Sequence, residues 1–239
     1  MALVALFLVR PLIGDGGIAT ATFSIAILLL LLFALYAVQV DELVGERETL
    51  VAQRRRRGIT GWALVVPAIV ARLAVIFVPS RTLYLTETIF WLLLFIFITW
   101  HLLRGVLRQR EITSETISMS ISVYLLLGFT WGLFYILLHH LQPLAFSLGS
   151  SSTPISSEQQ VFPVLIYFSL TTLSTVGFGD ITPVSLQARY AAVTEGITGQ
   201  FYLAILVARL VGMQMSQSAS RQAEHKTLDS TTKDSAKED

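Results

Sequence analysis

The sequence predicts an all-α membrane protein in which several helices cross the bilayer and one short helix enters it and returns. Hydrophobic residues make up 54% of the 239 residues, whereas charged residues make up only 14%. Five apolar runs are long enough to cross the hydrocarbon core, which takes about 20 residues as a helix. They cover residues 18–40, 59–78, 82–103, 116–138 and 190–210. A further apolar run, residues 163–174, is too short to span and leads into a glycine-containing loop.

The chain begins with an apolar stub, residues 1–17, whose first nine residues are uncharged. The stub lacks a basic start and a convincing cleavage site, so we predict no signal peptide. As a helix, nine residues reach about 13 Å, well short of the roughly 30 Å hydrocarbon core. Two interpretations stay open: the stub lies at the membrane interface, or it is the end of a further span that begins upstream.

Positive charge is distributed unevenly along the chain and predicts the orientation of the spans. Arginines follow the first and third spans and close the fifth, whereas residues 141–188 contain no lysine or arginine. By the positive-inside rule, the arginine-bearing ends face the cytoplasm and the loop after residue 174 faces outside. We interpret the run at residues 54–57 mainly as a topology signal, although basic clusters also bind anionic lipid or nucleic acid. A multi-pass protein of the plasma (cell inner) membrane, with no nucleic-acid partner, is therefore expected.

Two opposite charges are predicted inside the membrane. Arg72 lies six residues before the outer end of the second span, and Glu87 lies five residues into the third. Consecutive antiparallel spans place both side chains about 7–9 Å below the outer end, where an unpaired charge is costly. We therefore predict an Arg72–Glu87 pair; the alternative is that one or both side chains extend to the interface. The third span has no arginine in its middle, so a voltage sensor of the usual kind is not predicted.

The most informative segment is Thr175-Val176-Gly177-Phe178-Gly179-Asp180, which follows the short apolar run. Pro163 suits the first turn of a helix, because its missing N–H costs nothing there, and we predict a short helix over 163–174. This helix and the loop, TTLSTVGFGDITP without a gap, resemble the selectivity filter of the tetrameric potassium-channel pore-loop family. The resemblance covers residues 112–212 and implies an outer helix, a pore helix, a filter and an inner helix. A bundle of about three transmembrane helices, residues 18–111, precedes this pore module.

The residue types of the loop fit the chemistry that the resemblance implies. A potassium ion that enters a narrow pore loses its water, and inward-facing backbone carbonyls replace that water without burying net charge. The resemblance assigns the K+ ligands to the carbonyls of Thr175, Val176, Gly177 and Phe178 and to the Thr175 hydroxyl. Gly177 and Gly179 permit backbone angles that a Cβ forbids. Val176 and Phe178 are expected to pack behind the filter.

Asp180 stands at the outer end of the loop, and two roles stay open for it. It is either a turn-forming residue or one carboxylate of a ring that attracts cations at the outer mouth. Some relatives carry at the position of Thr171 a Glu that pairs with this Asp, so Asp180 needs another partner here or faces water. Tyr167 and Phe168 occupy positions where relatives carry aromatic residues around the filter.

The last apolar run resembles the inner helix that lines a potassium pore. The resemblance and the helical period predict four cavity-lining residues, namely Ile197, Gln200, Ala204 and Ala208. Gly196 falls at the position of the gating hinge, and Gly199 gives a second point where the helix can bend. The alternative role of these glycines is close helix packing.

Glu195 is the acidic residue of the last apolar run. It stands about 200° round the helix from Ile197 and is therefore expected to point away from the ion path, towards the pore helix. There its carboxyl group would accept hydrogen bonds from hydroxyls such as those of Thr171 or Thr172, or be protonated. A structural brace and a gating or pH-sensing group are both open roles, because acids inside a membrane are often functional.

Two further segments flank the pore module. His139 and His140 end the fourth span at the outer face, where they are either interfacial side chains or a proton-sensitive group. Residues 213–239 are polar without an apolar period and predict a disordered cytoplasmic tail.

The expected function is passive, potassium-selective conduction. One filter loop supplies a quarter of a carbonyl ring, so a homotetramer in the lipid membrane is expected. K+ is the transported ion, and no cofactor is expected. The sequence shows no metal-ligand spacing or nucleophile–base arrangement, so an enzyme is not predicted. Two alternatives stay open, namely a non-selective monovalent cation channel and an accessory or transport subunit of a potassium uptake system.

Overall fold

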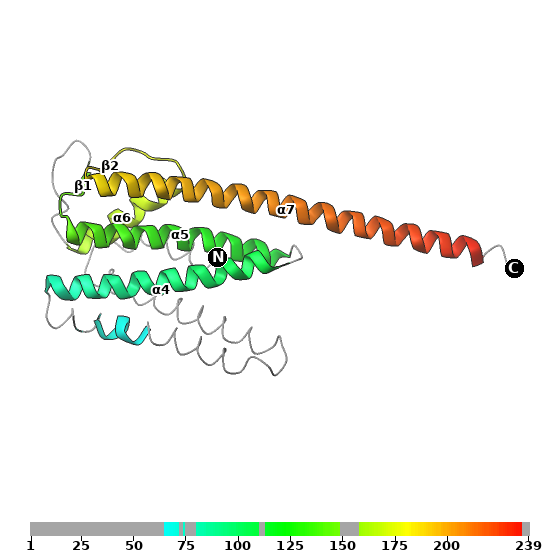
Figure 1. The fold of residues 1–239 in the computed structure, drawn as a ribbon, viewed down its shortest axis with the longest axis horizontal. Helices are drawn as coiled ribbons and strands as arrows, with labels where there is room; N and C mark the ends of the chain where they lie inside the picture. Colours follow the sequence, from blue (N-terminus) through cyan, green and yellow to red (C-terminus); the bar gives the residue numbers. More distant parts are fainter. Residues whose placement is uncertain (1–64, 72–73, 75–79, 110–112, 149–157, 236–239) are drawn as a thin grey trace.

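A computed structural model describes residues 65–71, 74, 80–109, 113–148 and 158–235 of the chain (Figure 1). The N-terminal stub, the first predicted span and Arg72 lie outside these residues, as does most of the second span. The described part is mainly helical, and three of its helices are long and apolar enough to cross a membrane. The predicted all-α membrane fold is thereby confirmed, with one short two-stranded ribbon that the sequence did not indicate.

Helices α4 (Arg81–Arg108) and α5 (Ser114–Leu141) cover the third and fourth predicted spans. Each begins at a hydroxyl cap that satisfies a free backbone N–H of the first turn. The Ser80 hydroxyl accepts from the Leu83 N–H at 3.3 Å. Thr113 and Thr116 form a reciprocal capping box at the start of α5. Phe95 of α4 packs on Phe129 of α5 with ring centroids 6.0 Å apart.

Helix α6 (Glu158–Leu173) is the predicted short helix, but it begins five residues earlier than expected. Pro163 therefore lies inside the helix and not in its first turn. The preceding Glu158-Gln159-Gln160 are good helix formers, and an acidic residue is favoured at a helix N-terminus. Pro163 removes only the bond to the Gln159 carbonyl, so the helix continues through it.

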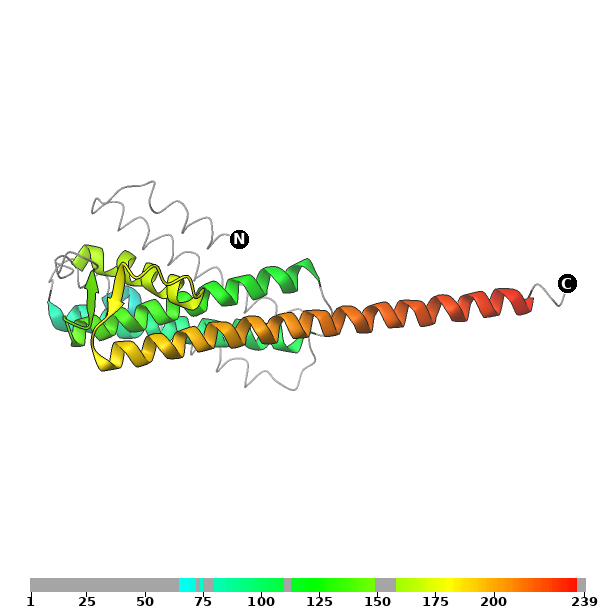
Figure 2. The same cartoon turned by 90° about the horizontal axis from the view of Figure 1, so that it is seen from above.

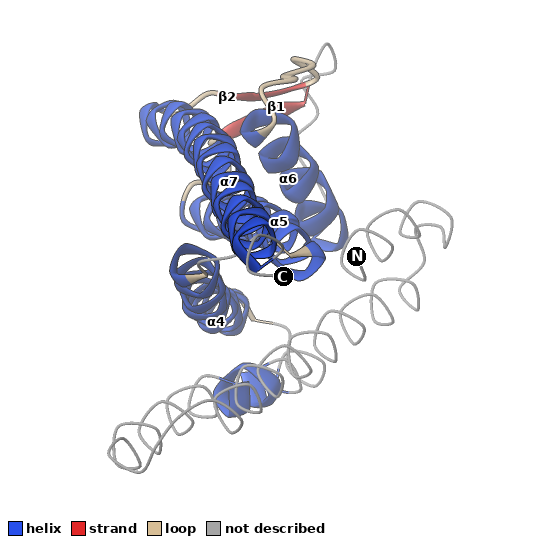
Figure 3. Ribbon diagram, turned by 90° about the vertical axis from the view of Figure 1, so that its right-hand side faces the viewer, coloured by secondary structure: helices blue, strands red, loops and turns tan. Residues whose placement is uncertain are grey.

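Close packing of α6 on α5 depends on two glycines spaced four residues apart. A Cβ on Gly128 would lie 2.5 Å from Leu170 Cδ2, and a Cβ on Gly132 would lie 2.5 Å from Ile166 Cδ1 and 3.2 Å from its Cα. Small residues with this spacing let helix backbones approach within a membrane. Viewed end-on, α5 lies between α4 on one side and α6 and α7 on the other (Figure 3).

Strands β1 (Phe146–Leu148) and β2 (Ile181–Pro183) form a short antiparallel ribbon. Their register pairs Phe146 with Pro183 and Leu148 with Ile181. The ribbon ties the chain that follows residues 175–180 to the chain that follows α5. Two further bonds extend it, because the N–H groups of Val184 and Ser185 both donate to the Ala145 carbonyl, at 2.8 and 3.3 Å.

Helix α7 (Leu186–Ser235) is one continuous helix of 50 residues, or about 75 Å. Its apolar part, Leu186–Met215, covers the fifth predicted span. Figures 1 and 2 show its C-terminal half running far beyond the other helices. The disordered tail expected from residue 213 is therefore helical as far as Ser235. No glycine or proline follows Gly212, and Gln, Ala, Arg, Glu and Lys favour helix, so nothing local ends it.

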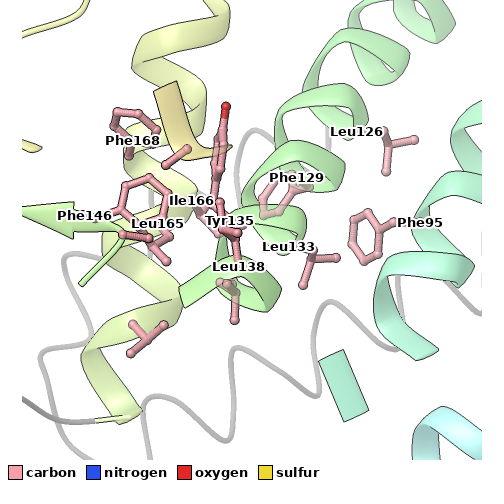
Figure 4. Packing of buried hydrophobic residues seen from close by; sticks show 14 of the residues in the cluster. Phe95, Leu126, Phe129, Leu133, Tyr135, Leu138, Phe146, Leu165, Ile166 and Phe168 are labelled. Carbon is pink, nitrogen blue, oxygen red and sulfur yellow. The ribbon is translucent and has the colours of Figure 1, made fainter. Parts of the chain in front are cut away.

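The hydrophobic core is centred on three aromatic rings from three elements (Figure 4). Tyr135 of α5, Phe146 of β1 and Phe168 of α6 contact one another edge-on, with centroids 5.1–5.5 Å apart. All three side chains are buried. This cluster fixes the short helix α6, and with it the loop at its C-terminus, against α5 and the ribbon.

Candidate functional site

The loop after α6 has an alternating backbone. Thr175, Gly177 and Gly179 have positive φ angles of 60°, 52° and 79°, whereas Val176 and Phe178 do not. In an ordinary strand, successive carbonyls point to opposite sides, whereas alternation of left- and right-handed residues turns them to the same side. A row of backbone oxygens on one side is the arrangement that carbonyl coordination of a cation requires. Thr175 is the only non-glycine residue with positive φ in the described part of the chain.

The inner end of the loop is bonded to the end of α6. The N–H groups of Val176 and Gly177 donate to the Thr171 carbonyl at 2.9 and 3.2 Å, and the Thr175 N–H donates to the Thr172 carbonyl at 3.0 Å. The Tyr124 hydroxyl of α5 donates to the Leu173 carbonyl at 3.2 Å. Carbonyls that a helix C-terminus leaves without partners are thus satisfied, and they hold the loop in place.

The side chains of Val176 and Phe178 are 53% and 70% exposed within one chain. The Phe178 ring stacks on Tyr167 of α6 with centroids 6.4 Å apart and an interplanar angle of 1°. Phe178 therefore lies on the α6 side of the loop, where the sequence places it.

Asp180 is exposed at the outer end of the loop, and its carboxylate accepts from the Ile181 N–H at 3.1 Å. Desolvation and the neighbouring Asp180 carboxylate raise the pKa of the Tyr167 phenol. Thr171 does not replace the Glu of relatives, because its hydroxyl donates to the Phe168 carbonyl at 2.9 Å. Tyr167 is thus the α6 side chain next to Asp180, a partner that the sequence left unnamed.

The predicted cavity-lining residues lie on an exposed side of α7. These are Ile197, Gln200, Ala204 and Ala208. The Gln200 amide donates to the Thr175 hydroxyl at 3.5 Å, which brings this face of α7 next to the inner end of the loop.

The two candidate hinge glycines have different surroundings. Gly199 is buried, and a Cβ there would lie 2.4 Å from the Leu173 carbonyl oxygen. The nearest atom to a Cβ on Gly196 would be the Thr172 carbonyl oxygen at 3.9 Å, an ordinary contact. The helix is uninterrupted at both positions. Close packing therefore requires a glycine at Gly199 and not at Gly196.

Glu195 is fully buried and points towards α5 and α6. Its Oε2 accepts from the Tyr135 hydroxyl at 2.6 Å, and its Oε1 lies against the Ser169 hydroxyl. These partners replace the expected Thr171 and Thr172, because the Thr172 hydroxyl donates to the Phe168 carbonyl at 2.8 Å. Helical geometry predicts the direction of Glu195, but its partners depend on the packing of α5 and α6.

Sequence reasoning missed the role of Arg209 in packing. Its guanidinium donates to the carbonyls of Val106 and Gln109 at the C-terminal end of α4. Cations are favoured at a helix C-terminus, where the last carbonyls have no helical partners. The only signal in the sequence was an arginine that closes an apolar run, and it predicted topology alone.

The remaining predicted residues lie away from the loop. Glu87 is buried in α4, and its proposed partner Arg72 is outside the described residues. His139 and His140 are buried, and His140 stacks on Tyr84 of α4. Among the residues that the structure describes, no group of three or more His, Cys, Asp or Glu is placed to hold a metal ion.

Comparison with known proteins gives one match. The family model described as "Ion channel" matches residues 121–215, which run from α5 through α6 and the loop into α7. Neither curated proteins nor solved structures gave a match to this chain. The matched segment contains the short helix, the alternating loop and the apolar part of α7, so residues 121–215 are similar to an ion-channel family, within a chain whose helices can cross a membrane.

Proposed function

We propose that the chain is a potassium-selective channel that conducts K+ passively through a homotetrameric pore. The observation that carries the proposal is the alternating backbone of residues 175–179 at the end of a short apolar helix. The carbonyls of Thr175, Val176, Gly177 and Phe178 and the Thr175 hydroxyl would replace the water of the ion. The negative end of the α6 dipole would face the ion path and favour a cation there.

Assembly of four chains is supported by what one chain leaves uncovered. One loop supplies one quarter of a fourfold carbonyl ring. Only 6% of the most apolar 18-residue stretch of α7 is buried within the chain. Val176 and Phe178 are also largely exposed. Lipid would cover the outer part of such a helix, whereas neighbouring copies would cover the filter and the ion-facing side.

The cavity below the filter would be lined by Ile197, Gln200, Ala204 and Ala208. None of these side chains carries a charge, so a hydrated ion there would meet four amides and otherwise small or apolar groups. The excess of arginine at the α4 and α7 ends supports an orientation in the plasma membrane with the filter outside. K+ is the transported ion in this proposal, and no cofactor takes part.

The decisive experiment is the reversal potential of the purified protein in planar bilayers, with potassium on one side and sodium on the other. A reversal potential far from zero, with the sign that opposes K+ flow out of the potassium side, is expected. A robust current that reverses near zero would instead favour the non-selective cation channel.

A pair of glycine variants assigns the current to the filter. Gly177→Ala places a Cβ at φ +52°, whereas Gly212→Ala meets nothing within 4 Å. The first variant is expected to lose selectivity or current, and the second to keep both. The native mass in detergent tests the assembly, because a single chain or a mixed complex would favour the accessory subunit.

A further inference from the structure

Glu195 lies where three helices meet and is completely shielded from solvent within the chain. Glu195, Tyr135 and Ser169 all have 0% exposed surface, and they come from α7, α5 and α6. Figure 4 shows the Tyr135 side chain extending out of the hydrophobic cluster with its hydroxyl at the far end. The carboxyl group thus joins α7 to α5 and to α6, the helix that leads into the loop.

The short oxygen–oxygen contacts around Ser169 require more protons than the hydroxyls supply. The Ser169 hydroxyl oxygen lies 2.6 Å from the Gly128 carbonyl oxygen and also contacts Glu195 Oε1. The Tyr135 hydroxyl oxygen lies 2.6 Å from Glu195 Oε2. Three contacts need three protons, but a serine and a tyrosine hydroxyl provide one each, and a backbone carbonyl provides none.

A protonated Glu195 supplies the missing proton. Its own O–H then donates to the Ser169 oxygen, the Ser169 O–H donates to the Gly128 carbonyl, and the Tyr135 O–H donates to the other carboxyl oxygen. With an ionised Glu195, the single Ser169 proton would go to the carboxylate. The Ser169 and Gly128 oxygens would then face each other without a hydrogen between them, which is unfavourable in a buried site.

Among the residues that the structure describes, no cation interacts with Glu195 to stabilise an ionised carboxylate. Residues 111–188 and 190–208 contain no lysine or arginine. Arg189 donates to the Pro183 carbonyl at the outer end of α7, and Arg209 donates to α4 at the other end. A buried charge without a partner is costly, so the neutral acid is favoured on this ground as well.

We propose that Glu195 is a protonated carboxylic acid that donates to Ser169 and thereby positions the pore helix α6 against α5 and α7. Ser169 lies six residues before Thr175 on the helix whose last carbonyls hold the filter loop. The chain of hydrogen bonds from Glu195 through Ser169 to Gly128 therefore holds α6, and with it the filter loop, in position. The proton state rests on the geometry alone, whereas the effect on conduction rests on the proposed function.

Loss of this proton at alkaline pH would break this chain of hydrogen bonds and loosen α6. The titratable groups that interact electrostatically with Glu195 are Tyr124 and Tyr135, both on α5. His139 and His140 lie at the outer end of α5, and histidines ordinarily change charge near pH 6.5. A response on the alkaline side that disappears with Glu195 therefore does not come from the histidines.

Infrared spectroscopy of the purified protein in lipid tests the proton state without any ion current. The carbonyl stretch of a protonated carboxylic acid is expected at neutral pH, and it should be lost in Glu195→Gln and retained in Glu87→Gln. Ser169→Ala should shift this band, because the acid loses its acceptor. A spectrum in which Glu195→Gln removes only a carboxylate band would overturn the proposal, as would a band that Ser169→Ala leaves in place.

Current measurements over pH test the positioning role. Glutamine matches a protonated glutamic acid, with an NH2 that donates to Ser169 and an oxygen that accepts from Tyr135. Glu195→Gln should therefore fold, conduct at neutral pH and lose the alkaline response, whereas Glu195→Ala should lose current at every pH. A Glu195→Gln variant that fails to fold or keeps the alkaline response would contradict the proposal. If potassium selectivity itself fails, the infrared result still decides the proton state.

Discussion

Gly199→Ala is the substitution with the largest effect that the packing of α7 predicts. The new Cβ would lie 2.4 Å from the Leu173 carbonyl oxygen and 2.9 Å from Leu173 Cδ1. Non-bonded heavy atoms prefer separations of about 3.5 Å, so the carbonyl would have to retreat by about 1 Å. Leu173 is fully buried, and its carbonyl already accepts from the Tyr124 hydroxyl.

The magnitude follows from three contributions. Overpacking of a tight core costs about 1–3 kcal/mol, and loss of the Tyr124 hydrogen bond costs about 1 kcal/mol more. Alanine in place of glycine in a helix returns about 1 kcal/mol. The net loss in the free energy of unfolding is therefore about 2 kcal/mol. Leu173 stands two residues before Thr175, so the shift should also reduce or destroy the ion current.

The matched control is Gly196→Ala, whose new Cβ would have its nearest neighbour at 3.9 Å. This variant should be as stable as the parent or up to about 1 kcal/mol more stable. Thermal unfolding in detergent and current in bilayers measure both variants. Equal stability of the two variants would refute the packing argument. A Gly196→Ala channel that is stable but rarely opens would favour the hinge role of Gly196.

Three further predictions concern other contacts. Gly132→Ala should lower the free energy of unfolding by about 1–3 kcal/mol, because the new Cβ would overlap with α6. Gly105→Ala, whose new Cβ has its nearest neighbour at 3.6 Å, should not change it, and thermal unfolding measures both variants. Arg209→Gln should lower the free energy of unfolding by about 1.5–3 kcal/mol, since it removes charged donors from the carbonyls at the end of α4. An unchanged unfolding temperature would show that these hydrogen bonds do not contribute to stability. Tyr167→Phe should change the single-channel conductance if Asp180 attracts cations, because it removes the phenol hydroxyl group next to that carboxylate. An unchanged conductance would leave Asp180 as a turn residue.

The sequence predicted the elements whose signal is local. The apolar runs over 82–103, 116–138 and 190–210 correspond to α4, α5 and the apolar part of α7. The direction of Glu195 followed from helical spacing alone, because a helix fixes the angle between residues two positions apart.

Contacts between distant segments could not be predicted in the same way. The partners of Glu195, 26 and 60 residues away, depend on how α5 and α6 pack. The ribbon joins strands that are too short to show an alternating pattern. The early start of α6 and the continuation of α7 to Ser235 are boundary errors. The residues before Pro163 favour helix and extend α6 backwards, and no glycine or proline after Gly212 ends α7.

Both ends of the loop after α6, residues 175–180, are anchored within the same chain, which has a mechanical consequence. At the inner end, three N–H groups hold to the carbonyls of α6, and at the outer end β2 holds to β1. A loop that is hydrogen-bonded at both ends resists elongation, because lengthening it means breaking a hydrogen bond at one end. Moving it sideways as a unit breaks none of these bonds. The spacing of oxygens along the loop is thus stiff, whereas the loop can still move as a unit together with α6 and β1.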